Sequence, residues 1–198
     1  MKGLAAYRFW GYAATFGALW GAIEITVGSF AHAIKLPFSG VVLAGVGAAM
    51  LVAARSVLPA RGLVLAAGAV CAGVKLLSPA GAVIGPMVAI LVESMLVEVV
   101  LMPAGANPVS GAAAGGISAL WALTQKVITQ TVLYGMPVIG IYVGILKQAE
   151  KTLHLPASGG MWVAGEFVGL VVLVGATLGV VGSLVGASAR RQLAAEVP

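Results

Sequence analysis

Six long apolar runs, separated by short polar or Pro/Gly-rich breaks, dominate the chain. Each is close to the roughly 20 apolar residues that a helix needs to cross a bilayer. The pattern predicts helices over residues 8–33, 37–55, 61–77, 79–102, 110–133 and 160–187. Ser78-Pro79 marks the start of the fourth predicted helix, because serine caps a helix N-terminus and proline suits its first position. The uncharged segment 103–108 predicts a tight turn.

The segment between the fifth and sixth runs has a different pattern. Its apolar residues recur at helical spacing, and its polar residues fall largely on the opposite side. The apolar set is Tyr142, Ile145, Leu146, Ala149 and Leu153, and the polar set is Lys147, Gln148, Glu150, Lys151 and His154. This predicts an outer amphipathic helix lying on the membrane. A plain connecting helix is the simpler interpretation, and a moving lid is the alternative.

Composition agrees with a membrane protein and excludes a soluble globular domain. Of 198 residues, 61% are hydrophobic and only 9% are charged, and the mean hydropathy is +1.08. An ordinary soluble protein carries about 25% charged residues. We therefore expect one all-α integral membrane domain over residues 1–198, with six transmembrane helices.

Orientation follows from the positively charged residues, which are enriched on the cytoplasmic side of membrane proteins. With six spans and the N-terminus inside, the cytoplasmic side would hold Lys2, Arg8, Arg55, Arg61, Arg190 and Arg191. The outer side would hold Lys35, Lys147 and Lys151. This distribution predicts a multi-pass protein of the plasma membrane with both termini in the cytoplasm.

Several functional classes find no support in the sequence. The net charge of +5 is not arranged as a basic stripe interleaved with aromatic residues, which argues against nucleic-acid binding. Cys71 alone can form neither a disulfide scaffold nor a cysteine metal cluster. His32 and His154 have no neighbours at metal-ligand spacing. No phosphate-binding loop or catalytic serine or cysteine motif occurs, so we expect no enzyme, no cofactor and no metal.

Ionisable residues inside apolar runs are costly, so each calls for a reason. Counting about 1.5 Å per residue along each predicted helix places one group from each of five helices in the outer half of the bilayer. They are Glu24, Lys75, Glu93, Lys126 and Glu166. Glu98 falls in the inner half, about 140° around the helix from Glu93, and belongs to a different environment.

Two interpretations of this cluster compete. The five groups form interhelical ion pairs that fix the packing, with Lys75 and Lys126 extending to the membrane surface, or they line an outward-facing pocket for a small solute. We favour the pocket, since interhelical pairing seldom needs five groups at one depth. Trp20 and Trp121 also fall near mid-depth, where they either form a wall of the pocket or pack in the interior.

The first predicted helix carries a row of small residues at four-residue spacing, Ala14, Ala18 and Ala22, with Gly17 and Gly21 in an adjoining row. Such rows let helices approach closely in membranes. Contact with another helix of the same chain is one interpretation, and docking of a separate partner is the other.

In layout, the chain resembles the substrate-binding S components of energy-coupling factor (ECF) transporters. The resemblance rests on the length, the six predicted helices, the N-in/C-in topology and the row Ala14-x-x-x-Ala18-x-x-x-Ala22. It implies that the row docks on a transmembrane T component, that separate ATPase subunits drive transport, and that solute binds in the outer half. It implies no particular solute.

Alternatives from other classes stay open. An ion- or proton-coupled secondary transporter could use Glu24, Glu93 or Glu166 as the proton carrier, although no inverted repeat is visible. A structural or accessory membrane subunit would use its buried charges only to hold helices together.

Overall fold

The computed structural model describes residues 2–34, 39–78, 84–134, 140, 144, 147, 151 and 160–196. The helices of this part are α1 (Lys2–Ala33), α2 (Ser39–Val57), α3 (Leu63–Lys75), α4 (Ile84–Ala104), α5 (Pro108–Tyr134) and α7 (Gly160–Glu196). Each coincides with one of the six predicted runs. Most of the predicted amphipathic segment lies outside the described residues. Two of its polar residues, Lys147 and Lys151, are described, and both are helical and exposed.

The helix ends differ from the predicted ones for local reasons. Helix α1 begins at Lys2 and α7 continues to Glu196, because the alanine-rich sequence beyond each apolar run still favours a helix. Helix α3 begins only at Leu63, since Gly62 has a left-handed backbone (φ 80°). Asn107 caps α5 by accepting hydrogen bonds at Oδ1 from Val109 N and Ser110 N.

Four of these helices are long and apolar enough to cross a membrane, judged by length and composition. They are α2, α4, the part of α1 from Leu4–Ala31 and the part of α7 from Ala164–Ala195. Helix α3 is apolar but has only 13 residues. Large apolar side chains such as Phe30, Val99 and Leu173 are exposed on the outside of the bundle, where lipid can solvate them. The protein is thus an all-helical protein with the features of a membrane protein.

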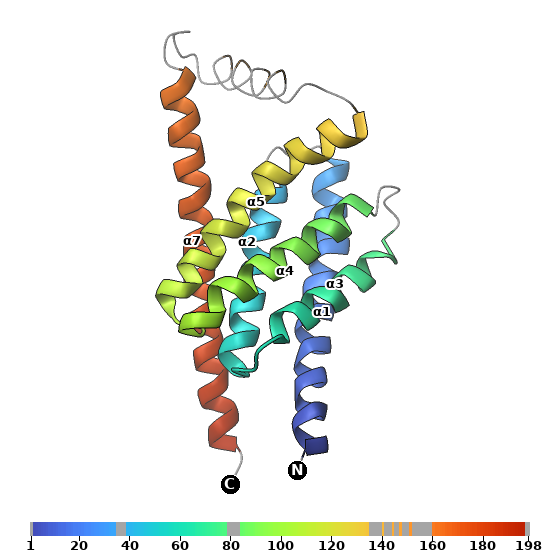
Figure 1. Ribbon diagram of the computed structural model, residues 1–198, viewed down its shortest axis with the longest axis vertical. Coiled ribbons are helices and arrows are strands. Elements are labelled where there is room, and N and C mark those ends of the chain that lie inside the picture. The colour runs from blue at the N-terminus through green and yellow to red at the C-terminus, as the bar shows by residue number, and fades with distance from the viewer. Residues whose placement is uncertain are drawn as a thin grey trace.

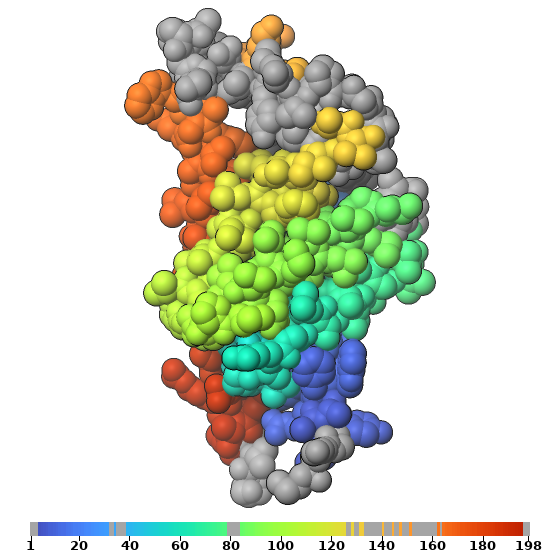
Figure 2. Space-filling model, viewed as in Figure 1, coloured from blue at the N-terminus to red at the C-terminus, as the bar shows by residue number. Residues whose placement is uncertain are grey.

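Helix α2 is the centre of the arrangement and contacts α1, α3, α4, α5 and α7. Figure 1 shows α1, α2 and α7 running along the long axis while α3, α4 and α5 cross them obliquely. Both chain termini lie at the same end. In the space-filling view, α3, α4 and α5 cover one face, and the ends of α1 and α7 project beyond them (Figure 2).

Glycines set the close packing of α7 on its neighbours. A Cβ atom at Gly175 or Gly179 would overlap backbone atoms of Gly115 or Gly111 on α5, and one at Gly182 would overlap Ala49 on α2. Small residues at such crossings bring two backbones together without a hydrophobic driving force. This packing fixes the positions of α2 and α5, which contribute to the cavity described below.

The two small-residue rows of α1 have different environments. Gly17 and Gly21 are buried against α3, where added Cβ atoms would press on Val70 and Val74 respectively. Ala14, Ala18 and Ala22 are exposed, so this row faces out of the bundle as a docking surface would require.

Glu98 holds the start of α3 near the end of the bundle where the chain termini lie. Its carboxylate accepts hydrogen bonds from Gly62 N at 2.8 Å and Val64 N at 3.3 Å, and its Oε1 lies 3.6 Å from Arg55 Nη1. Arg55 also donates to the carbonyl of Ala60. The expectation that Glu98 belongs to a different environment from Glu93 is confirmed.

Candidate solute-binding cavity

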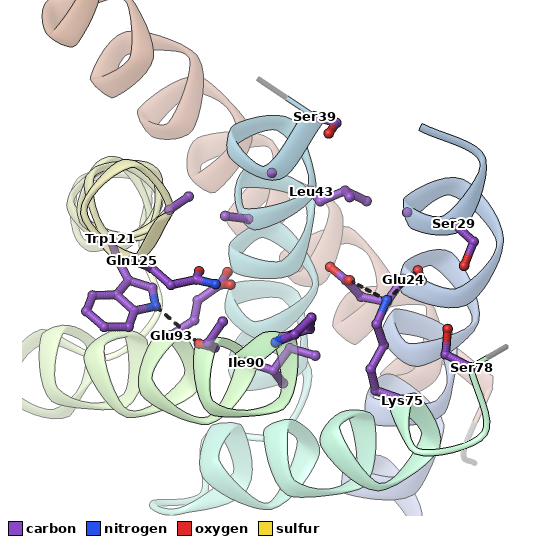
Figure 3. Close-up of a pocket in the computed structure, with 16 residues that line it drawn as sticks. Glu24, Ser29, Ser39, Leu43, Lys75, Ser78, Ile90, Glu93, Trp121 and Gln125 are labelled. Carbon is purple, nitrogen blue, oxygen red and sulfur yellow. Dashed lines mark hydrogen bonds and ion pairs between the residues drawn. The ribbon is translucent and has the colours of Figure 1, made fainter. Parts of the chain in front are cut away.

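A cavity of about 300 Å³ lies among α1 to α5, in the half of the bundle away from the chain termini. Its wall combines charged and polar residues with apolar ones. The polar and aromatic contributors are Glu24, Ser29, Ser39, Lys75, Ser78, Glu93, Trp121 and Gln125. Figure 3 shows Glu24 and Lys75 on one side of the cavity and Glu93, Trp121 and Gln125 on the other.

Glu24 and Lys75 form an ion pair between α1 and α3. Lys75 Nζ lies 3.2 Å from Glu24 Oε2 and donates a second hydrogen bond of 2.8 Å to the backbone carbonyl of Glu24. Gly28 lies next to the pair, and a Cβ atom there would contact both charged groups. The pair therefore joins α1 to the end of α3 and also forms part of the cavity wall.

Glu93 is 95% buried on α4, and its environment is unlike that of Glu24. Its Oε1 atom is buried and has no hydrogen-bond partner among the described residues. Figure 3 shows its side chain pointing into the cavity beside Gln125. A buried polar atom without a partner is costly, so this oxygen is available to bind a ligand, as is Ser29 Oγ, the other unpartnered buried atom on the described wall.

Trp121 forms a fixed part of the wall opposite the ion pair. Its Nε1 donates a 3.2 Å hydrogen bond to the carbonyl of Ala89 on α4, which holds the indole in place. Ile90 and Leu43 add apolar surface. The cavity thus offers a planar ring, apolar side chains and a small number of polar groups, as small-molecule sites generally do.

The predicted convergence of five charged groups is met by three of them. Glu24, Lys75 and Glu93 line one cavity. The prediction is wrong for Glu166, which is exposed on α7 and is not among the described lining residues. The side chain of Lys126 lies outside the described part of the structure, so its predicted place in the site stays a prediction.

The two tryptophans that were expected at similar depth have different roles. Trp121 lines the cavity, whereas Trp20 is 1% exposed within the core and is not one of the lining residues described. A Cβ atom at Gly47 of α2 would lie 2.7 Å from the indole of Trp20, so the glycine makes room for the ring. Assigning Trp20 to the pocket wall is wrong, and interior packing is the correct alternative.

Sequence reasoning missed several polar residues of the wall, notably Ser29, Ser39 and Gln125. Gln125 follows Trp121 by four residues and therefore shares its helix face, a signal that could have found it. The two serines lie near helix ends, where uncharged polar residues are too common to single out. Among the described residues, no group of three or more His, Cys, Asp or Glu side chains could hold a metal ion.

Comparisons of the chain with protein-family models, with curated proteins and with solved structures gave no match.

Proposed function

We propose that the protein is the membrane-embedded substrate-capture subunit of an ECF-type importer in the plasma membrane, with six spans and both termini in the cytoplasm. It would bind a small solute in the cavity from outside and pass it on with the help of other subunits. The observation that carries the proposal is the cavity itself, with Glu93 facing into it and its Oε1 lacking a hydrogen-bond partner among the described residues.

Two features of the fold support this assignment. The cavity lies in the half away from the termini, which is the outer half if both termini are cytoplasmic. The row Ala14, Ala18 and Ala22 is exposed and leaves a smooth surface on α1 for a helix of another protein. The proposed partners are a transmembrane T component, which would dock on this row, and ATPase subunits that supply the energy.

A proton-coupled secondary transporter is the second candidate, and the same carboxylate favours it. A buried glutamate that has one oxygen without a described partner can take up and release a proton as solute binds and leaves. This mechanism would need no other subunit.

Transport by the purified chain distinguishes the two candidates. A thermal-shift screen against vitamins, their precursors and related heterocycles would first supply a bound solute. Proteoliposomes containing the chain alone are then expected to bind that solute without accumulating it, and to accumulate it once a T component and ATPases are added with ATP. Accumulation by the chain alone under a proton gradient would favour the secondary transporter, and a chain that binds nothing would be an accessory subunit.

A further inference from the structure

The described wall of the cavity holds two carboxyl groups and one ammonium group, those of Glu24, Glu93 and Lys75. Lys75 is already engaged by Glu24 through two hydrogen bonds, so these two groups are neutral as a unit. Glu93 lies across the cavity and adds a second carboxylate. When Glu93 is ionised, two carboxylates against one ammonium give the described wall a net charge of −1.

We propose that the solute is a small organic cation, such as an amine, an amidine or a protonated aminoheterocycle, whose charged group binds Glu93. This inference rests on the proposed function and names the chemical class of solute for the same cavity. A buried carboxylate is unfavourable unless it is paired and hydrogen-bonded. A cationic N–H group supplies both the charge and the missing hydrogen bond to Oε1, and such charge-assisted bonds are stronger than neutral ones.

The remainder of the wall fits the body of such a molecule. The volume of about 300 Å³ is at the small end of the range for ligand sites, which suits a compact solute of one or two rings. The Trp121 indole, held by Ala89, and the side chains of Ile90 and Leu43 offer flat and apolar surface. An aromatic face near a cation also contributes a favourable electrostatic interaction.

An anionic solute would find no free positive charge on the described wall. It would face the Glu93 carboxylate, and the ammonium of Lys75 is already paired with Glu24. Lys126 follows the cavity residue Gln125 on α5, and its side chain lies outside the described atoms. The variant Lys126→Met therefore tests directly whether this lysine reverses the charge preference.

Three probes of matched shape test the charge preference: tryptamine, a cation; tryptophol, its neutral alcohol; and indole-3-acetate, an anion. Their affinities for the purified protein in lipid nanodiscs would be measured by titration. The protein is expected to bind tryptamine roughly tenfold or more tighter than tryptophol, and indole-3-acetate weakest, because one charge-assisted hydrogen bond contributes that much.

Variants assign the preference to one residue. Glu93→Gln is expected to bind tryptamine and tryptophol about equally, and its melting temperature shows whether it folds. Glu166→Gln removes an exposed carboxylate outside the described wall and is expected to keep the full preference. Lys126→Met is expected to leave the advantage of the amine at least as large, because the substitution only removes a positive charge. The comparison among the three probes on the unmodified protein gives a result even where a variant does not fold.

Two different results would contradict the inference, and they have different consequences. If tryptophol or indole-3-acetate binds as tightly as tryptamine, or if Glu93→Gln keeps the advantage of the amine, the solute is not a cation held by Glu93, but the cavity remains a solute site. If neither these probes nor a larger set of one- and two-ring cations, alcohols and acids binds, the proposed function fails as well.

Discussion

At the scale of single residues, two glutamates on α4 show how differently a buried charge can be used. Glu93 and Glu98 are both almost fully buried, at 5% and 2% exposure. Glu98 is paired with Arg55 and accepts two backbone hydrogen bonds from the start of α3. Glu93 has an oxygen with no partner among the described residues. One is a structural group, and the other is available to a ligand.

This contrast predicts that the substitution of Gln for Glu lowers the free energy of unfolding by different amounts at the two positions. Glu98→Gln is expected to lower the free energy of unfolding by about 3 kcal/mol, because it leaves the buried Arg55 without a counter-charge. Glu93→Gln is expected to change it by less than about 1 kcal/mol, because no hydrogen bond to Oε1 is lost. Denaturation in mild detergent, followed by circular dichroism, measures both. Equal, large losses would show that Glu93 also has a structural role.

At the scale of elements, the fold depends on where glycines let helices touch. Gly179→Ala on α7 is expected to destabilise the protein by about 1–3 kcal/mol, because the new Cβ would overlap the Gly111 carbonyl on α5. Gly169→Ala on the same helix is the matched control, since a Cβ there meets nothing within 4 Å. The melting temperatures of the two variants test this. A tolerated Gly179→Ala would mean that α5 and α7 can separate slightly at little cost.

The exposed alanine row gives the second prediction at this scale. Ala18→Trp is expected to leave the melting temperature and solute binding unchanged but to reduce uptake to background, because the indole keeps a partner helix away from α1. Leu173→Trp introduces the same side chain at an exposed position on α7 and is expected to preserve uptake. Uptake assays in cells that carry the complete importer distinguish the two. Normal uptake by Ala18→Trp would remove this row from the docking surface.

The helices were more predictable than the contacts between them. Apolar runs and their breaks placed all six described helices, because the cost of exposing polar groups to lipid constrains where charges occur. Counting residues along each helix also predicted the level at which each charged group lies. This correctly placed Glu24, Lys75 and Glu93 at one site. Depth does not give the direction in which a side chain points around the helix axis. Glu166 and Trp20 were misassigned for that reason, since close packing such as Gly47 against Trp20 sets the rotation of each helix.

At the scale of the whole molecule, the arrangement separates the two surfaces that the proposed function requires. The cavity lies in the half away from the termini and is lined by residues of α1 to α5. The alanine row lies on the outside of α1, on a different face of that helix from the glycines that pack on α3. The proposed solute binding and the proposed partner docking are therefore expected to respond to different substitutions, as the variants at Glu93 and Ala18 are designed to show.

The most direct test of an outward-facing cavity is the reactivity of a cysteine placed in its wall. Ala122 lines the cavity on α5, and Leu120 is an exposed residue of the same helix, where lipid would cover it. Each would be replaced by cysteine in a Cys71→Ala background, which removes the chain's single native cysteine. Intact cells would then be treated with impermeant methanethiosulfonate reagents carrying either a trimethylammonium or a sulfonate group.

We expect the cysteine at 122 to react from outside, faster with the cationic reagent than with the anionic one, and the cysteine at 120 to remain unmodified. Water and ions reach a hydrated cavity, whereas a thiol facing lipid does not ionise and does not react. No reaction at 122, or a reaction only after the cells are opened, would contradict an outward-facing solute site.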